Sequence, residues 1–469
     1  MSTRHALSTS DSFRTTIESP RADFYKTLLV ASFFVYLLAN RLIQDIYVLP
    51  VGLSIRPWEP VLGLVLITWA LWMITQPKPL PRGGVGLVGL LLIAVLIGAY
   101  FVNAPDFTLF QADASDRGIE RVVLFSGLFL ASYHLARDRE TARRFVMVIV
   151  SLTIVQGLIG VYEFVIGRNA TFLHNLWTSL GLEADPRGLR VFNETIKARL
   201  TGELRAMATA PNPLVLSALL AVGSLVTFAL LAHTSSRRKR KQLFVLLLIQ
   251  MVSLPLTNSR SGFVVLIAVG LVMLFLTIRQ WPQMLPFGLW LAIAMGITFA
   301  FVPSSARLLL NSFTRPQDDP NLEVRIERID RVPELMEENP FLGAGYMTND
   351  VDIIVFDNAF NLGLVELGII GFMTIMTFFL VCIGRSLSGL ARAETGEEPL
   401  MLAGVIGGLS VIVASATFDA WTFDQFFPTT IILMGIGVGT ADVAHRRSRA
   451  ATTGPIIPGR EPAEVGLDG

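Results

Sequence analysis

Apolar runs of about 20 residues follow one another along most of the chain, separated by short polar segments. A run of this length allows an α-helix to cross the hydrocarbon core of a bilayer. We therefore predict an all-α polytopic membrane protein with about 12 transmembrane helices. The predicted spans are 24–39, 59–76, 84–103, 119–135, 145–166, 213–233, 242–257, 261–278, 285–303, 359–384, 400–418 and 426–441.

The basic residues gather in a few short connections between these spans. Short loops rich in Lys and Arg stay in the cytoplasm, so with an even number of spans both termini are predicted to be cytoplasmic. Polar tails are predicted at 1–23 and 442–469, on either side of a transmembrane domain at 24–441. The basic connections are Lys78–Arg82, Arg137–Arg144, Arg237–Lys241, Arg385–Arg392 and the segment after Arg446.

Composition supports the membrane class and excludes several others. The 469 residues are 52% hydrophobic and only 16% charged, whereas soluble proteins carry about a quarter charged residues. A net charge of +1 gives no reason to expect a nucleic-acid partner. The single cysteine, Cys382, excludes an intramolecular disulfide. Residues 1–23 lack the short apolar core of a signal peptide.

Two long connections are predicted on the outer face, at about 167–211 and 303–357. The first contains RNATFLHNLWTSLG, whose aromatic and aliphatic residues recur at helical spacing, so we expect a helix lying on the membrane surface. The second contains NLEVRIERIDRVPELMEEN, which combines helix formers with alternating charge and also predicts a helix.

Arginines near the outer ends of spans need an explanation, because a charge deep in a membrane costs about 2.5–3.5 kcal/mol on insertion scales. Arg260 joins two spans with hardly any loop, and Arg205 precedes a span that begins with prolines. Arg325 and Arg328 are three residues apart and share a helix face. Each has an ordinary alternative: contact with lipid headgroups for Arg260, a solvated loop for Arg205, and surface ion pairs for Arg325 and Arg328.

The segment from Asp357 leads into an apolar helix with Asn358 and Asn361 in its first turn. An aspartate there can cap the helix, and capping would keep the carboxylate ionised, as a general base requires. Glu366, deeper in the same span, is expected to be a buried structural acid. Gly363, Gly368 and Gly371 are expected to let neighbouring helices approach closely.

Three or more cations and one carboxylate on the same membrane face suggest a site for an anionic, lipid-borne substrate. Arginine suits phosphate because its planar guanidinium makes paired, charge-assisted hydrogen bonds. We expect no metal site: the acidic pair at 318–319 stands alone, and His174 has no partner at ligand spacing. Asp45, Asp419 and Asp424 could contact sugar, although helix-end or loop roles explain each of them.

Four motifs in order resemble the O-antigen ligase and O-antigen polymerase family. NPFLGAGY, followed by an Asn-containing turn and LVELGIIGF, resembles the family signature. TNSRSG resembles its Ser-Arg-Gly motif, and RAMATAPNP resembles its arginine-containing approach to an Asn-Pro turn. VRIERIDRVPELMEENP is similar to the helix before the signature. The resemblance covers about residues 195–380.

The resemblance implies a C-type glycosyltransferase-like membrane enzyme that needs neither metal nor cofactor and works on the outer face of the bacterial inner membrane. Such enzymes take glycan from undecaprenyl pyrophosphate. A ligase transfers it to lipid A core, and a polymerase transfers it to the next lipid-linked repeat unit, as in O-antigen or exopolysaccharide biosynthesis. A flippase and a chain-length regulator would be possible partners.

By motif, Arg260 and Arg325 would hold the pyrophosphate, with Arg328 as a further candidate for that role, and Arg205 would contact a phosphate or the glycan. Asn358 and Asn361 add polar groups for substrate binding. Asp357 stands where the family has a histidine, and a carboxylate could serve as the general base. This departure favours a polymerase, with a ligase as the alternative. A transporter is a third possibility, but the chain has no internal repeat and few charges near mid-membrane besides Glu366.

Overall fold

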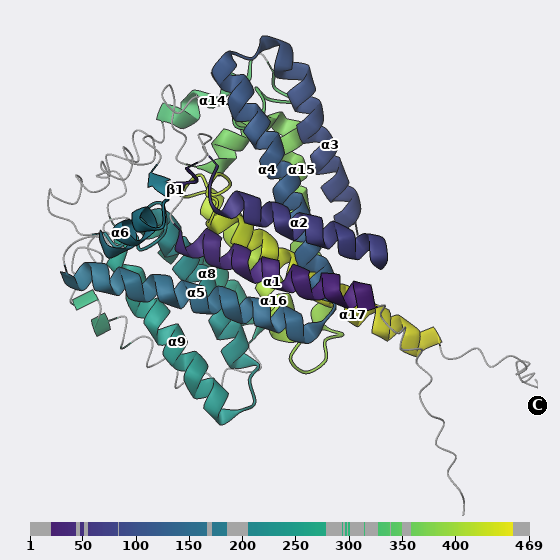
Figure 1. Ribbon diagram of the computed structural model, residues 1–469, viewed down its shortest axis with the longest axis vertical. Helices are drawn as coiled ribbons and strands as arrows, with labels where there is room; N and C mark the ends of the chain where they lie inside the picture. Colours follow the sequence, from purple (N-terminus) through teal and green to yellow (C-terminus); the bar gives the residue numbers. More distant parts are fainter. Residues whose placement is uncertain are drawn as a thin grey trace, which may run out of the picture.

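The computed structural model describes residues 20–43, 47–50, 55–82, 84–166, 171–184, 205–277, 327–337, 339–348 and 358–453, with a few single positions between 293 and 314. Its regular structure is almost entirely helical (Figure 1). The elements are α1 (Pro20–Leu42), β1 (Tyr47–Val48), α2 (Trp58–Thr75), α3 (Val85–Asn103), the 3-10 helix η1 (Ala104–Asp106), α4 (Leu109–Leu135), α5 (Arg139–Ile166), α6 (Thr171–Ser179), β2 (Glu183–Ala184), α8 (Pro213–Ala232), α9 (Arg237–Leu256), α10 (Arg260–Leu276), α14 (Val332–Met336), α15 (Ala359–Leu390), α16 (Glu398–Ser415) and α17 (Phe426–Thr453).

The helices coincide with the predicted spans wherever the structure describes them; the span predicted at 285–303 lies outside the described residues apart from single positions. Within the described part, 8 helices are long and apolar enough to cross a membrane: α1, α2, α3, α5, α8, α15, α16 and α17. The all-α polytopic membrane class is therefore confirmed. The count of 12 spans remains a prediction.

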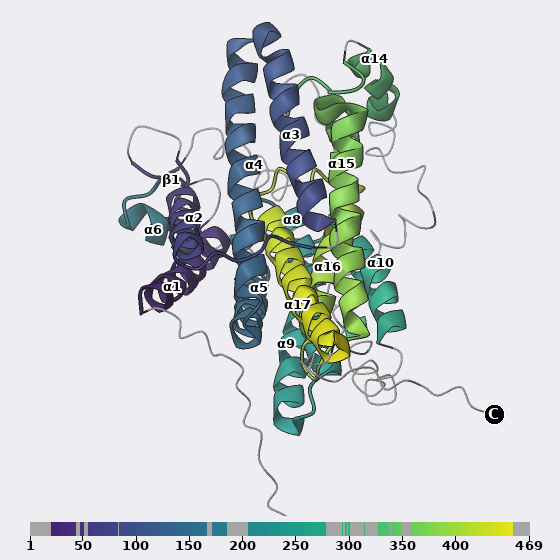
Figure 2. The ribbon, with the colours of Figure 1, turned by 90° about the vertical axis from the view of Figure 1, so that its right-hand side faces the viewer.

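Three helices form the centre of the molecule. The most apolar stretches of α8, α16 and α17 are 89%, 78% and 94% buried by other parts of the protein, against 17% for α3. Figure 2 shows α17 lying between α4 and α15, both of which it contacts. Where α16 crosses α17, a Cβ added to Gly404 would lie 2.6 Å from the Cα of Gly437, so only glycine allows this approach.

The last helix is longer than its sequence predicts. The apolar pattern ends at 441, but α17 continues to Thr453, so the predicted C-terminal tail begins inside a helix. The reason is Asp442, which is 1% exposed and accepts hydrogen bonds from Arg385 Nε and the Tyr133 hydroxyl, both at 2.7 Å. These contacts hold the polar extension of α17 against α15 and α4.

The described outer connections contain the expected helix and one unexpected pairing. Helix α6 lies within the first long connection, as its spacing predicted. Strands β1 and β2 pair antiparallel, with Tyr47 opposite Ala184 and Val48 opposite Glu183. This short ladder joins the connection after α1 to the connection after α5.

Candidate functional site

The signature loop, residues 339–348, packs into a break in α15. The helix is interrupted at Gly368, whose φ of 62° and ψ of −175° are not helical. A break leaves backbone groups on both sides without their usual helical partners, and the signature loop pairs four of them. The N–H groups of Ala344 and Gly345 donate to the carbonyls of Val365 and Glu366 (both 2.9 Å), and the N–H groups of Ile369 and Ile370 donate to the carbonyls of Pro340 and Phe341 (2.9 and 3.1 Å).

Two glycines make this packing of the signature loop into the break in α15 possible; we call it the interlock. Gly343 and Gly368 have φ values of 69° and 62°, a region that side chains with a Cβ rarely adopt. A Cβ on Gly343 would lie 2.4 Å from the carbonyl carbon of Glu366, and one on Gly368 would lie 2.4 Å from that of Phe341. Gly368 thus admits a loop, where the sequence predicted that it would admit a neighbouring helix.

Asn103, the last residue of α3, forms hydrogen bonds with both ends of the turn in the signature loop. Its side-chain nitrogen donates to the Gly343 carbonyl at 3.0 Å, and its side-chain oxygen accepts from Asn339 at 3.1 Å. Asn103 is 6% exposed. Our sequence analysis missed this residue, although an asparagine at the end of a strongly apolar span could have marked it.

The start of α15 is capped by Asn358. Its side-chain oxygen accepts from the N–H of Asn361 at 2.7 Å, and its backbone is extended, as expected for an N-cap residue. The expectation that Asp357 caps this helix is therefore corrected, because the neighbouring residue performs that role. Asp357 itself lies outside the described residues.

Arg328 lies near the same helix end. It is partly buried in the helical residues 327–330, just before α14. The first residue of α14, Val332, packs against Leu362 and Val365 of α15. The structure thus brings the segment carrying Arg328 to the first two turns of α15. Arg325 lies outside the described residues.

Arg205 and Arg260 belong to two segments that lie side by side. The N–H of Ala206 donates to the carbonyl of Leu256 at 3.0 Å, at the end of α9 and shortly before Arg260. The Ser217 hydroxyl, on α8, accepts from the N–H of Gly262 at 3.2 Å, which ties the start of α10 to α8. Arg205 is exposed and Arg260 is partly buried.

A buried carboxylate shapes the turn that follows Arg205. Glu163, on α5, is 1% exposed and accepts from the N–H groups of Met207 at 3.0 Å and Ala208 at 2.9 Å. Ala208 has a φ of 49°, so these bonds hold a conformation that alanine rarely adopts. Our sequence analysis missed Glu163; an acid within a predicted span could have singled it out.

The connection between α16 and α17 contacts both the segment after Arg205 and the outer half of α15. On one side, Gln425 donates to the carbonyl of Thr209 at 2.9 Å, within the segment that begins at Arg205. On the other side, a Cβ on Gly363 of α15 would lie 2.4 Å from the Trp421 ring. This connection therefore links the segment after Arg205 to the outer half of α15.

An ion-pair cluster holds this connection against the signature loop. Asp424 is 1% exposed and pairs with Arg56 and, at 3.1 Å, with Arg121 of α4. Arg121 also donates to the carbonyl of Thr422 at 3.3 Å and approaches the sulfur of Met347 at 3.8 Å. Asp424 thus has a structural loop role, the ordinary alternative that the sequence offered for it.

Burial changes the acidity of two groups in this region. It raises the pKa of Asp419, in the α16–α17 connection, to about 6, against the effect of a hydrogen bond from Thr422 and the charge of Arg121. Burial also raises the pKa of the Tyr346 phenol, in the signature loop. Both groups are therefore biased toward their neutral forms.

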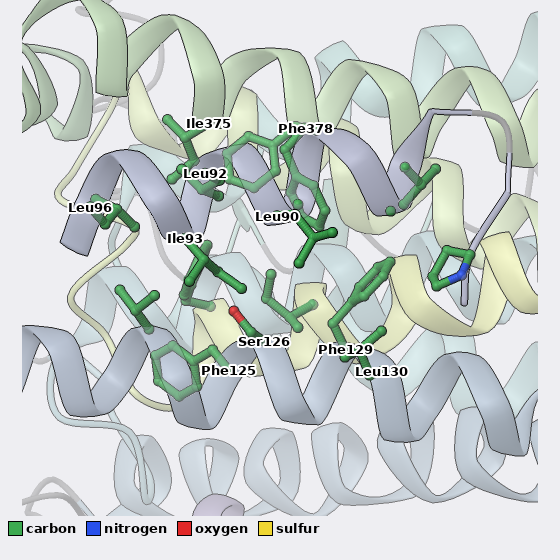
Figure 3. Close-up of a pocket in the computed structure, with 18 of the residues that line it drawn as sticks. Leu90, Leu92, Ile93, Leu96, Phe125, Ser126, Phe129, Leu130, Ile375 and Phe378 are labelled. Atoms are coloured by element: carbon green, nitrogen blue, oxygen red, sulfur yellow. The ribbon is translucent and has the colours of Figure 1, made fainter. Parts of the chain in front are cut away.

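An apolar groove leads away from the signature loop. It is lined by side chains of α3, α4, α15 and α17. Figure 3 shows leucine, isoleucine and phenylalanine side chains along its length, with Ser126 among them. At the end near the signature loop it is lined by Tyr346, Leu96 and Leu367. Such a groove is suited to a hydrocarbon chain.

In a comparison with known protein families, residues 242–376 match a family model described as O-antigen ligase. The chain carries an O-antigen ligase domain. The matched segment includes α9, α10, the signature loop and the broken part of α15, so the family resemblance predicted from the motifs is confirmed. The protein is thus a membrane protein related to glycan-transferring enzymes. No curated protein matches the chain.

The O-antigen ligase domain contains most of the predicted site residues. Arg260, Arg325, Arg328 and the pair Asp357–Asn358 lie within the match, as does Asn361. Arg205 precedes it but is joined to it through the bond between Ala206 and Leu256. The roles of these residues in binding and catalysis remain predictions.

Proposed function

We propose that this protein is a polysaccharide polymerase. It transfers a glycan from undecaprenyl pyrophosphate to a hydroxyl of another lipid-linked repeat unit, on the outer face of the bacterial inner membrane. The reaction inverts the configuration at the sugar C1 and uses no metal ion. The resemblance of four motifs and the O-antigen ligase domain support the class of reaction.

The observation that carries the proposal is the apolar groove that meets the signature loop at Tyr346 and Leu367. A lipid-linked donor needs a slot for its polyprenyl tail next to the place where its pyrophosphate reacts. The groove offers such a slot between α3, α4, α15 and α17, beside the loop that bears the family signature. Its lining is almost entirely apolar, which suits an isoprenoid chain.

In the proposed reaction the acceptor hydroxyl attacks the sugar C1, and the bond from C1 to the phosphate oxygen breaks. Undecaprenyl pyrophosphate leaves with the electron pair of that bond, and Asp357 takes the proton of the hydroxyl. Arg260 and Arg325 stabilise the negative charge that develops on the pyrophosphate. Arg205, Arg328 and the side chains of Asn358 and Asn361 position the substrate.

The side-chain contacts of Asn358 support this division of roles. Because Asn358 caps α15 at 2.7 Å from the N–H of Asn361, capping is no longer needed to account for a carboxylate at position 357. A base role for Asp357 therefore does not compete with a structural one. The alternative function is a ligase, which would use the same groove and arginines but pass the glycan to lipid A core or another acceptor.

The proposal is tested with purified protein and an undecaprenyl-pyrophosphate-linked repeat unit, in buffer containing a metal chelator. The parent is expected to produce a ladder of longer lipid-linked glycans. Asp357→Asn and Arg260→Ala should each slow the reaction by about 10²–10³-fold, the loss seen when one charge-stabilising group is removed from an active site.

Arg144→Ala serves as the matched control, because Arg144 is exposed and its ion pair in the described structure is with Glu140 of its own helix. A ladder that survives Asp357→Asn would remove Asp357 from its role as base. Transfer to added lipid A core, with no ladder, would make the protein a ligase. Loss of all activity on chelation would contradict the metal-independent mechanism.

A further inference from the structure

The far end of the apolar groove opens beside a cluster of arginines, which we call the basic end. It consists of Arg82, Arg137, Arg385 and Arg446 around the single buried carboxylate of Asp442. Arg137 donates to the Tyr133 hydroxyl at 3.4 Å, and that hydroxyl donates to the carboxylate of Asp442 at 2.7 Å. Among the described residues, this cluster contains four guanidinium groups and one carboxylate, so its net charge is positive.

The carboxylate of Asp442 already accepts several hydrogen bonds. It accepts from Arg385 Nε at 2.7 Å, the Tyr133 hydroxyl at 2.7 Å and the backbone N–H of Arg82 at 3.1 Å. Arg446 reaches only the backbone carbonyl of Asp442, at 3.3 Å. The carboxylate therefore neutralises Arg385 in the main and leaves the other three arginines largely uncompensated.

Two arginines of the basic end also keep buried donors without acceptors. Arg137 donates through Nη2 to the carbonyl of Pro79 at 2.5 Å, but its Nε is buried and has no hydrogen-bond partner among the described residues. Arg446 likewise has a buried Nη2 without a partner there. A buried, unpaired donor costs about 1–3 kcal/mol, and more when it is charged. These two side chains therefore carry positive charge that the described residues do not fully balance.

The loop between α2 and α3 connects the basic end to the groove. Pro79 and Arg82 bind the cluster as just described, while the intervening Leu80 and Pro81 line the groove together with Val85 at the start of α3. Leu80 is 52% exposed, so much of its side chain remains open at the mouth of the groove. Headgroup-binding and chain-binding surfaces are thus contiguous.

We infer that the basic end is a binding site for an anionic phospholipid. Arg82, Arg137 and Arg446 hold the phosphate of the headgroup, and one acyl chain enters the groove between Pro81 and Val85. Guanidinium groups match phosphate oxygens in geometry and charge, and basic pockets between membrane helices on the cytoplasmic side suit anionic lipid headgroups. The lipid comes from the leaflet on the side of the basic loops.

This assignment goes beyond the proposed polymerase function and does not depend on it. The phospholipid enters the groove at the end near Pro81 and Val85. The proposed function places the carrier lipid at the other end, beside the signature loop. Binding can be measured without any transfer reaction, so failure of one proposal leaves the other intact.

The test uses the purified full-length protein in detergent and native mass spectrometry, with phosphatidylglycerol or phosphatidylcholine added. The parent is expected to retain phosphatidylglycerol in preference to phosphatidylcholine. Arg137→Gln and Arg446→Gln should each weaken phosphatidylglycerol binding by about fivefold, as expected for one basic residue at an anionic lipid. Arg144→Gln, an exposed arginine that follows Arg137 in the same basic connection but is not part of the basic end, should leave binding unchanged.

A second variant tests the acyl chain without changing any charge. Gly89 lines the groove, and a Cβ there would lie 3.6 Å from the side chain of Phe378, so Gly89→Leu places its side chain into the groove. Retention of phosphatidylglycerol should fall at unchanged melting temperature.

Equal retention of both lipids by the parent would overturn the proposal. So would full phosphatidylglycerol binding by the Arg137→Gln and Arg446→Gln double variant, or by Gly89→Leu. A variant that elutes as a single folded species and loses only phosphatidylglycerol supports it.

Discussion

Two carboxylates in the connection between α16 and α17 differ in their partners. Asp424 pairs with Arg56 and Arg121, whereas Asp419 accepts one hydrogen bond, from Thr422 at 2.6 Å, and its second oxygen is buried without a hydrogen-bond partner in the described structure. Burial outweighs that bond and the charge of Arg121, which is why the pKa of Asp419 rises from 3.8 to about 6. Two acids of one loop thus differ in how their charge is balanced: Asp424 has two arginine partners, whereas Asp419 is biased toward its neutral form.

The raised pKa of Asp419 predicts a pH dependence of stability. Between about pH 4 and pH 6 the native carboxyl keeps its proton while the unfolded one loses it, so stability falls as the pH rises through this window. Asp419→Asn cannot ionise and should lack this fall. At pH 7 it is expected to be more stable than the parent, by at most about 3 kcal/mol.

The measurement is the melting temperature in detergent at pH 4, 5, 6 and 7 for the parent and Asp419→Asn. Asp113→Asn is the control, since Asp113 is exposed and pairs with Arg117 one helical turn away. Parallel curves for the parent and Asp419→Asn would contradict the assignment.

At the scale of elements, the broken helix α15 and the signature loop form one unit. Each supplies donors and acceptors that the other lacks, through four backbone hydrogen bonds between residues 340–345 and 365–370. The Asn-Pro-x-x-Gly-x-Gly spacing therefore has a structural reason apart from any chemistry. It places a turn with positive φ at Gly343 directly against the break at Gly368.

Replacing Gly368 is predicted to destabilise this unit. Alanine at φ 62° costs about 1–2 kcal/mol from its backbone conformation alone, and its Cβ would overlap the Phe341 carbonyl. Gly368→Ala should lower the melting temperature by several degrees. Gly384→Ala, in the same helix with nothing within 4 Å of an added Cβ, should melt no lower than the parent, because alanine favours the helix.

Melting is followed by size-exclusion chromatography with tryptophan fluorescence after heating. If Gly368→Ala and Gly384→Ala melted together, the interlock would not contribute to stability. Protease cleavage within residues 339–348 should also increase in Gly368→Ala alone, because the signature loop loses its partners.

At the scale of the whole molecule, the basic connections converge on one end. Asp442 brings together α15, α4 and the α2–α3 loop, and Arg447 pairs with Glu394 and Glu397 in the α15–α16 connection. Lys26 of α1 lies 3.7 Å from Asp138, between α4 and α5. Positive charge is thus concentrated at the end of the bundle away from the signature loop, which is the end predicted to be cytoplasmic.

Accessibility of single cysteines tests this orientation. The one native cysteine, Cys382, is buried, so Cys382→Ser provides a background without other thiols. In that background, Asp106→Cys near the outer end of α3 should react with a membrane-impermeant maleimide added to spheroplasts. Ser236→Cys, in the basic connection before α9, should react only after the membrane is permeabilised.

Both sites are exposed in the structure, so burial does not account for a difference in labelling. Labelling of Ser236→Cys in intact spheroplasts would reverse the predicted orientation and move the proposed active site to the cytoplasmic face.

The sequence alone determined the membrane class, the approximate position of each described helix and the family motifs. Hydrophobic runs report helices directly, because a bilayer requires about 20 apolar residues for each span. Motif spacing also pointed to the segments around Arg205, Arg260 and Asn358. It assigned the cap of α15 to the wrong residue because Asp and Asn cap equally well, and only backbone geometry shows which one precedes the first helical turn.

The tertiary structure alone decided how those segments are joined. Arg121 and Asp424 are 303 positions apart, and Asn103 and Gly343 are 240 apart, yet each pair is in direct contact. Local sequence carries no signal for such pairings, since any apolar helix satisfies its own backbone hydrogen bonds whichever neighbour it packs against. Which polar groups meet depends on how helices pack, and that is set by side-chain shape across the whole bundle.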